Sequence, residues 1–252
     1  MTKNVTGMTK IIGLLGTNIS KSKSPEIHNL SFKARNLDYI YLSLETCPEN
    51  LETALSALKQ FGARGFNVTM PLKEVVMPFL DEITPEARMC GSVNTVLIDQ
   101  GKLIGYNFDG IGFVKSLKVD ELFEIKERKV VLVGAGGAAK SIAIELAKEV
   151  SELVISNRNY SKAVELVERI NNKQFNCKCH AIHLDEKIIK QELENAALLI
   201  DATPVGAGEE TNQSIIQNID TLHSKLFIAS LVYNPEKTEL VKMAESIGCR
   251  VS

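Results

Sequence analysis

Short apolar runs alternate with longer segments of helical periodicity along this 252-residue chain, and this alternation restricts the folds open to it. In the second half, intervening segments such as YSKAVELVERINN repeat apolar residues at the spacing of a helix. The runs themselves read as strands: KVVLVG, ELVISN, CKCHAIHL, AALLIDAT and KLFIASLVY. Because strands that alternate with helices form parallel sheets covered on both faces, the pattern predicts an α/β fold.

The first half shows the same alternation, with strands predicted at KIIGLLG, YIYLSLE, GFNVT and SVNTVLI. Ser24 followed by Pro25 predicts a helix that has Ser24 as its N-cap and proline at its first position. Near the middle, GIGFVKSLKVDELFE reads as one linking helix. We therefore expect two α/β domains, residues 1–107 and 108–252, with the active site in the cleft between them.

Charge and hydropathy exclude several classes of partner. The formal net charge of −2 gives no electrostatic reason to expect nucleic acid or an anionic membrane surface. The chain has no uncharged apolar run long enough to span a bilayer, and its first ten residues lack the apolar block of a signal peptide. We expect a cytoplasmic protein, a monomer or homodimer, that acts on a small molecule.

Five cysteines at irregular spacing imply no disulfide framework. The segment CKCHAIH holds ligand types that suit zinc, at Cys177, Cys179, His180 and His183. Its spacing matches no common zinc module, and Cys177, Cys179 and Ala181 alternate as the inward face of a strand does. The sequence favours a strand here and no metal site.

A glycine-rich turn follows the strand KVVLVG and precedes a predicted helix. It places Gly134, Gly136 and Ala139 in the pattern G-x-G-x-x-A, in which glycines let backbone N–H groups approach a pyrophosphate at a helix N-terminus. A turn that serves packing alone is the alternative. The strand and helix on either side favour a dinucleotide site.

The end of the next strand indicates which dinucleotide binds. NAD enzymes carry an acidic residue there for the ribose 2′-hydroxyl, whereas this chain reads ISNRNYSK. Arg158 suits a 2′-phosphate, with Asn157 and Lys162 beside it, although an arginine at a strand end is often only solvated. We expect NADP in preference to NAD.

Three further segments hold candidate residues for a substrate site. Ser22 and Ser24 stand at a helix start, where hydroxyls and free N–H groups bind anions. Lys73 lies in the first turn of a helix opened by Pro71, a position that the helix dipole disfavours for a cation. Asp109 lies in GYNFDGIG, between a strand and a helix. Locally, each pattern also fits a purely structural role.

Taken together, these segments resemble the shikimate dehydrogenase family, from about residue 11 to the last residue. The resemblance rests on spaced motifs in order: SKSKSPEIHN, GFNVTMPLK, GSVNT, GYNFDGIG, GAGGAAKS, SNRNYSKA, ATPVGAG and SLVYNP. It implies a substrate domain, a Rossmann-like domain, and NADP-dependent interconversion of 3-dehydroshikimate and shikimate, in aromatic amino-acid biosynthesis. A quinate or aminoshikimate dehydrogenase, or a non-catalytic relative that binds ligand, are the alternatives.

The resemblance also assigns roles to residues of this chain. Ser22, Ser24 and Tyr233 would hold the substrate carboxylate, and Lys73 with Asp109 would form an acid–base pair. Those two residues, Thr69 and Asn94 would bind the ring hydroxyls. The implied cofactor contacts are Gly134, Ala135, Gly136, Gly137, Ala138, Asn157, Arg158, Lys162, Thr203, Pro204 and Val205.

Four departures from the family pattern accompany the resemblance. Phe108 stands where a threonine is usual, Ser230 where an aspartate is usual, and Ala207 where a methionine is frequent. The chain ends at GCRVS, whereas the family continues with a helix that packs back on the substrate domain and supplies a glutamine. From the sequence we expect a loosened cleft unless another contact substitutes, and we expect Phe108 to affect which cyclitol acid fits.

Overall fold

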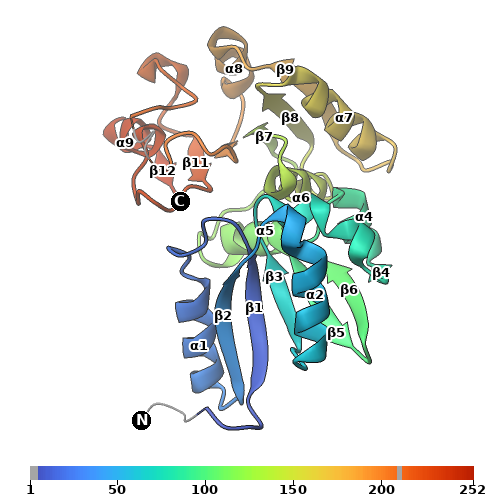
Figure 1. The fold of residues 1–252 in the computed structure, drawn as a ribbon. Coiled ribbons are helices and arrows are strands. Elements are labelled where there is room, and N and C mark those ends of the chain that lie inside the picture. The colour runs from blue at the N-terminus through green and yellow to red at the C-terminus, as the bar shows by residue number, and fades with distance from the viewer. Residues whose placement is uncertain (1–4, 209–211) are drawn as a thin grey trace. The chain divides into compact units, whose positions relative to one another are not determined.

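Two six-stranded sheets, one in each half of the chain, organise the structure, a computed structural model that describes residues 5–208 and 212–252. The chain divides into a first unit that ends at Phe108 and a second that runs from Asp109 to Ser252 (Figure 1). Both units combine a sheet with helices, which confirms the α/β class. Among the described residues, every helix is too short or too polar to cross a membrane.

The first sheet has the strand order β2-β1-β3-β5-β6-β4. Its strands are β1 (Lys10–Gly16), β2 (Tyr39–Glu45), β3 (Gly65–Val68), β4 (Glu82–Ile83), β5 (Thr95–Asp99) and β6 (Lys102–Tyr106). β1 pairs in parallel with β2 and β3, but β5 is antiparallel to both β3 and β6. The expectation of a wholly parallel sheet is therefore wrong for this unit.

A two-residue turn explains the antiparallel pair. Gln100 and Gly101 connect β5 to β6, and both have positive φ, 49° and 80°. That conformation belongs to tight hairpin turns, which join antiparallel strands, whereas a parallel connection needs a long crossover. The turn thus reverses β5 relative to its neighbours.

Helices pack on both faces of the first sheet. They are α1 (Ser24–Ala34), α2 (Leu51–Gln60), α3 (Leu72–Val75) and α4 (Pro85–Cys90), with 3-10 turns at Pro48–Asn50 and Met77–Phe79. Leu51, Leu55 and Leu58 of α2 are buried with Leu15 and other residues of one sheet face. Leu14 and Tyr41, on the opposite face by strand alternation, pack with Phe32 of α1.

The start of α1 differs from the prediction by one residue. Lys23 is the N-cap, and it makes no side-chain capping hydrogen bond. Instead, Ser22 Oγ accepts from the backbone N–H of Ser24, at 3.2 Å. Ser24 is therefore the first helical residue, and the prediction that it is the N-cap is wrong.

The second sheet is parallel throughout, with the order β12-β11-β10-β7-β8-β9. Its strands are β7 (Lys129–Val133), β8 (Glu152–Asn157), β9 (Lys178–His183), β10 (Leu198–Asp201), β11 (Phe227–Ser230) and β12 (Arg250–Val251). Connections run from β7 to one side through β8 and β9, then return to β10 on the other side. This is the doubly wound order of dinucleotide-binding folds, and it confirms the Rossmann-like prediction.

The helices of the second unit are α5 (Asp109–Val119), α6 (Gly137–Leu146), α7 (Tyr160–Asn171), α8 (Glu186–Leu193) and α9 (Glu239–Ser246), with a 3-10 turn at Ile219–Thr221. The central strand β7 is buried continuously from Val130 to Val133, each residue 0% exposed. Uninterrupted burial follows because helices cover both faces of a parallel sheet.

A close approach in the second unit joins α5 to α6. The N–H of Gly110 donates to Ser141 Oγ at 2.8 Å. A Cβ on Gly110 would lie 2.2 Å from the carbonyl oxygen of Ser141. Only glycine fits this position, because the obstructing atom is backbone and has no rotamer to change.

We predict that Gly110→Ala lowers the free energy of unfolding by about 1–3 kcal/mol, because the added methyl overpacks the contact between α5 and α6. Gly112→Ala is the matched control in the same helix, where an added Cβ meets nothing within 4 Å. It raises stability by roughly 0.5–1 kcal/mol through helix propensity. Urea unfolding measures both variants, and equal effects would contradict the assigned contact.

Candidate active site

In the first unit, strand directions bring the predicted substrate residues to one edge of the sheet. β1, β3 and β6 run the same way, so their carboxyl ends share an edge, and the amino end of the antiparallel β5 lies there too. Ser22 and Ser24 follow β1, Thr69 follows β3, and Asn94 precedes β5. The hairpin turn that the sequence analysis missed is what places Asn94 at this edge.

Backbone hydrogen bonds hold these residues close together. The N–H of Thr69 donates to Leu15 O of β1 at 2.8 Å. The N–H of Val93, the residue before Asn94, donates to Lys73 O at 2.8 Å. Lys73 lies in the first turn of the four-residue helix α3, as the sequence predicted, and it is half-buried. Thr69, Lys73 and Asn94 thus form one group, tied to β1.

The loop after β6 is tied to the same group. The N–H of Phe108 donates to Asn94 Oδ1 at 3.1 Å. Asn107 is buried, and its Nδ2 donates to the carbonyl and the hydroxyl of Ser92, at 2.9 and 3.0 Å. Phe108 is 49% exposed and its ring stacks on Tyr106, with centroids 5.6 Å apart. The sequence analysis missed Asn107, although its place before Asp109 in the motif was a signal.

Three polar residues that the sequence analysis did not single out lie between Ser24 and Asn94. Tyr41 on β2, Asn67 on β3 and Thr95 on β5 all face α1, since strand alternation assigns them to that side of the sheet. Only Asn67 carried a sequence signal, because it is the one polar side chain in the strand GFNV.

The remaining predicted substrate residues belong to the second unit. Asp109 is the first residue of α5, so a helix does start at this corner, but the helix ends at Val119 and the predicted extension through DELFE is wrong. Tyr233 lies after β11 and is 70% exposed.

The glycine motif forms an open cradle at the carboxyl end of β7. Gly134 has a φ of +124°, and a Cβ there would lie 2.9 Å from Ala202 O, so both conformation and space require glycine. Gly136 is the N-cap of α6, without a side-chain cap, and a Cβ on it would meet nothing within 4 Å. The N-terminal N–H groups of α6 thus face a space suited to a pyrophosphate.

The loop after β8 carries two exposed cations. Arg158 precedes α7 and Lys162 lies in its first turn. Asn157 Nδ2 donates to Asn159 O at 2.9 Å, and Asn159 caps the helix by accepting from the N–H of Ser161. Two cations beside a helix N-terminus fit a phosphate, as the sequence predicted for the 2′-phosphate of NADP.

A buried carboxylate supports the loop after β10. Asp201 is 1% exposed, and its Oδ1 accepts from the N–H and the hydroxyl of Thr203, at 3.0 and 2.7 Å. Thr203 Oγ1 accepts in turn from the N–H of Val205, at 3.2 Å. Burial raises the pKa of Asp201 to about 6, although the hydrogen bonds from Thr203 lower it. Thr203 and Val205 were predicted cofactor contacts, whereas Asp201 was missed.

The cysteine and histidine side chains of CKCHAIH lie on both faces of the sheet. The His183 ring stacks on Tyr160 of α7, with centroids 4.0 Å apart, and Cys179 alternates onto that same side. His180 faces the other side, where it lies 3.4 Å from Glu192 Oε1 of α8. The four residues therefore do not converge on one ion.

His180 does belong to a different cluster, in which single ligand atoms of Glu152, His180 and Glu192 lie within 4.8 Å of one another. Lys129 Nζ is 2.6 Å from Glu192 Oε2 and 3.9 Å from Glu152 Oε1. The ammonium supplies positive charge to this cluster, as a metal ion would.

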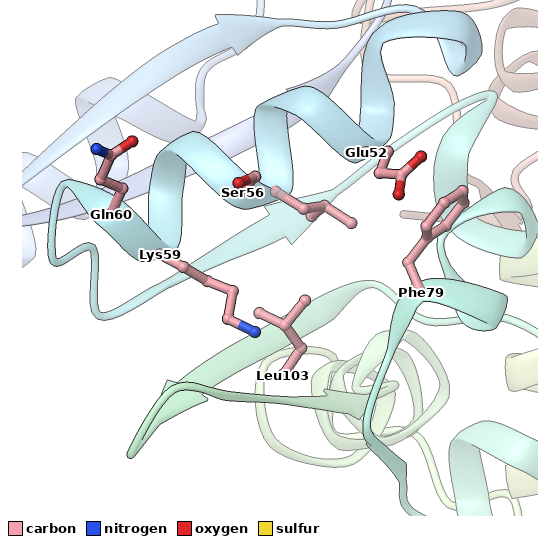
Figure 2. A pocket seen from close by; sticks show the side chains of 7 residues that line it. Glu52, Ser56, Lys59, Gln60, Phe79 and Leu103 are labelled. Carbon is pink, nitrogen blue, oxygen red and sulfur yellow. The ribbon is translucent and has the colours of Figure 1, made fainter.

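A surface groove of about 580 Å³ lies within the first unit, away from the predicted site residues. Figure 2 shows side chains of α2 on one side and Phe79 and Leu103 on the other. Its lining residues are Glu52, Leu55, Ser56, Lys59, Gln60, Phe79 and Leu103, and none of them is a predicted substrate or cofactor residue.

Family models match both units. Residues 14–96 match the shikimate dehydrogenase substrate binding domain, and residues 117–229 match shikimate / quinate 5-dehydrogenase. The shikimate dehydrogenase (NADP(+)) of Alkaliphilus metalliredigens is 44% identical over 98% of this chain and 86% of its own length.

Solved structures agree with the family models. Shikimate 5-dehydrogenase from Listeria monocytogenes, in complex with shikimate and NAD, has a TM-score of 0.91 and 35% identity, over 100% of this chain and 88% of its own. The Thermus thermophilus enzyme, in complex with NADP(H) and shikimate, has a TM-score of 0.84 and 31% identity, over 97% and 87% of the two chains.

We predict that replacing Asp201 with asparagine changes how stability depends on pH. The folded pKa is raised from 3.8 to about 6, so Asp201 favours the folded state most below pH 3.8, and this contribution is lost as the pH rises through about 6. The shift corresponds to about 3 kcal/mol. Between pH 4 and pH 7, the stability of Asp201→Asn should therefore rise relative to wild type by up to that amount.

Urea unfolding of both proteins across this pH range measures the difference. Only the change with pH tests the prediction. The asparagine N–H₂ also alters the free energy of unfolding, by an amount that is set by its hydrogen-bond partners and is the same at every pH. A difference that stays flat from pH 4 to pH 7 would show that the Asp201 carboxylate does not titrate in this range.

Proposed function

The chain belongs to the shikimate dehydrogenase family, and we propose that it interconverts 3-dehydroshikimate and shikimate with NADP as the hydride carrier. The observation that carries this proposal is the group of polar residues at one edge of the first sheet. Ser22, Ser24, Thr69, Lys73 and Asn94 follow or precede strands whose ends meet there. These side chains suit a small molecule that carries one carboxylate and several hydroxyls.

Each group has a proposed task. Ser22 and Ser24 donate hydrogen bonds to the substrate carboxylate, beside the N-terminal N–H groups of α1 and with Tyr233 as a further donor. Thr69 and Asn94 bind the ring hydroxyls. Their positions rest on backbone hydrogen bonds to β1 and β6, so they are fixed before the substrate arrives.

Proton transfer is assigned to Lys73 and Asp109. Reduction of a ketone needs a hydride at carbon and a proton at oxygen. The Lys73 ammonium donates that proton and stabilises the negative charge that develops on the oxygen. The Asp109 carboxylate accepts a hydrogen bond from the reacting hydroxyl and orients it. In the oxidative direction, Lys73 takes the proton back.

The second unit holds the cofactor. The open backbone at Gly134 and Gly136 receives the pyrophosphate, with Ala135, Gly137 and Ala138 in the same turn. Arg158 and Lys162 bind the 2′-phosphate, and the loop of Thr203, Pro204 and Val205 lies beside the nicotinamide half. When bound, the nicotinamide supplies or accepts the hydride.

A quinate dehydrogenase is the second candidate, and Phe108 favours it. The ring is 49% exposed and its backbone is bound to Asn94, so it lies beside the proposed hydroxyl-binding group. Comparing kcat/KM for shikimate and quinate with NADP decides between the two substrates, because differences in the pocket appear in that ratio. Binding of either acid without turnover would instead support a non-catalytic relative.

We predict that Lys73→Ala leaves the fold intact and lowers kcat about 10²–10⁴-fold, the range for loss of a general acid. Nicotinamide absorbance with shikimate and NADP measures turnover. Lys59→Ala, which removes an exposed lysine from α2, is the control and keeps wild-type rates. Turnover near the wild-type value in Lys73→Ala would remove Lys73 from the proposed mechanism.

We predict that Arg158→Ser lowers kcat/KM for NADP about 10- to 100-fold, because a hydrogen bond to a charged group contributes about 1.5–3 kcal/mol. The same ratio for NAD should change less than threefold or so, since NAD lacks the 2′-phosphate. Lys173→Ser, just beyond the other end of α7, is the control. Equal losses with both cofactors would contradict the assigned contact with the 2′-phosphate.

A further inference from the structure

A continuous series of hydrogen bonds crosses the α1 side of the first sheet. Ser22 Oγ donates to Ser24 Oγ at 3.2 Å, and the Ser24 side chain hydrogen-bonds Tyr41. The Tyr41 hydroxyl donates to Asn67 Oδ1 at 2.8 Å. The series therefore begins at the two serines and reaches the third strand of the sheet through one tyrosine.

The series continues to Asn94. Asn67 Nδ2 donates to Thr95 Oγ1 at 2.9 Å, and Thr95 Oγ1 donates to Asn94 Oδ1 at 2.9 Å. From Tyr41 onward the bonds run in one direction, through Asn67 and Thr95 to Asn94, a residue proposed to hold the substrate hydroxyls. Each serine hydroxyl carries one proton, so Ser22 and Ser24 turn that proton to the carboxylate when the substrate binds. We call the six residues the polar relay: Ser22, Ser24, Tyr41, Asn67, Thr95 and Asn94.

Tyr41 is the member of the polar relay with the most restricted position. It is 1% exposed, and the His28 ring of α1 stacks on its ring, with centroids 4.3 Å apart and planes 3° from parallel. Asn29 of α1 accepts from the N–H of Tyr41 at 2.9 Å and donates to its carbonyl at 3.0 Å. Two successive residues of α1 thus fix the backbone and the ring of Tyr41 relative to Ser24.

The Tyr41 hydroxyl determines which way round the side-chain amides of Asn67 and Asn94 are oriented. An asparagine amide can turn by 180°, which exchanges its donor and its acceptor. A donor at Tyr41 requires Asn67 to present Oδ1 there, and Nδ2 then points to Thr95. Thr95 in turn donates to Asn94 Oδ1, which also accepts from the N–H of Phe108. The donors of Asn94 are then its Nδ2 hydrogens, which suit a substrate hydroxyl oxygen.

Burial keeps Tyr41 in its donor form. It raises the pKa of the Tyr41 hydroxyl to about 12, although the hydrogen bond with Ser24 lowers it. The hydroxyl therefore retains its proton over the working range of an enzyme. Burial also lowers the pKa of His28, so a neutral ring faces Tyr41 at pH 7.

We propose that Tyr41 is a positioning residue for substrate binding, whose hydroxyl orders the Asn67 and Asn94 amides and lies in contact with Ser24 at the start of α1. Tyr41 itself acts through these neighbours and not on the substrate. The inference rests on the proposed function, because it requires Ser24 and Asn94 to bind the same molecule. It adds that Tyr41 fixes which hydrogen-bonding groups Asn94 presents to that molecule.

Tyr41→Phe tests this inference, since it keeps the ring stacked on His28 and removes only the hydroxyl. The KM for shikimate should rise about five- to tenfold, the loss expected for one or two net hydrogen bonds, while kcat and the KM for NADP stay within about twofold. Tyr39→Phe is the matched control, because it removes a hydroxyl from the same strand, two residues earlier, and should leave all three constants unchanged. Calorimetric titration with shikimate should give the same ratio of Kd values.

Thr95→Val provides a second, independent test. It interrupts the polar relay between Asn67 and Asn94 and should also raise the KM for shikimate. If the polar relay acts as a unit, combining Tyr41→Phe with Thr95→Val should raise the KM for shikimate by less than the product of the two single effects. Independent effects, multiplying in full, would contradict coupling through Asn67.

The outcomes separate this inference from the proposed function. Wild-type protein that neither binds nor oxidises shikimate overturns the proposed function, and the inference with it. Wild-type protein that does both, with an unchanged Kd and KM in Tyr41→Phe, overturns the inference alone. A variant that loses stability and affinity for shikimate and NADP alike would show that Tyr41 has only a structural role.

Discussion

The close approach of α5 to α6 holds together the two helices of the second unit that carry the proposed catalytic carboxylate and the proposed pyrophosphate site. With no Cβ on Gly110, its N–H reaches Ser141 Oγ, and the first turn of α5 lies against the helix that begins at the glycine cradle. Asp109 immediately precedes this contact. The carboxylate proposed to orient the reacting hydroxyl is therefore positioned from the same helix that is proposed to receive the pyrophosphate.

In the first unit, strand direction has the corresponding role. Ser24, Thr69 and Asn94 come from segments far apart in sequence, and they meet because the ends of β1, β3 and β5 lie at one edge. A parallel β5 would carry Asn94 to the opposite edge. The two-residue turn at Gln100 and Gly101 is thus as important to the site as the residues proposed to bind the substrate.

Local patterns were enough to predict most elements, the α/β class and the dinucleotide-binding turn, because periodicity and glycine spacing are properties of short segments. They did not predict the antiparallel β5, since that direction depends on a turn between two runs and not on the runs themselves. Tyr41, Asn67 and Thr95 were missed for a related reason. Each looks like an ordinary strand residue, and only the register of four strands brings the three side chains together. Asp201 was missed because an acidic residue at a strand end is usually exposed.

The chemical types of the residues proposed to bind substrate indicate how the site would discriminate between ligands. Apart from Lys73, the residues proposed to bind substrate in the first unit are hydroxyls and amides, which are neutral and directional. An arginine in their place would hold many carboxylates equally well. Neutral donors ordered by the polar relay would instead reject an analogue that lacks one hydroxyl, because an amide held in a fixed orientation would be left without its substrate partner. Selectivity among cyclitol acids would then depend more on the fixed orientation of the Asn67 and Asn94 amides than on the charge of the site.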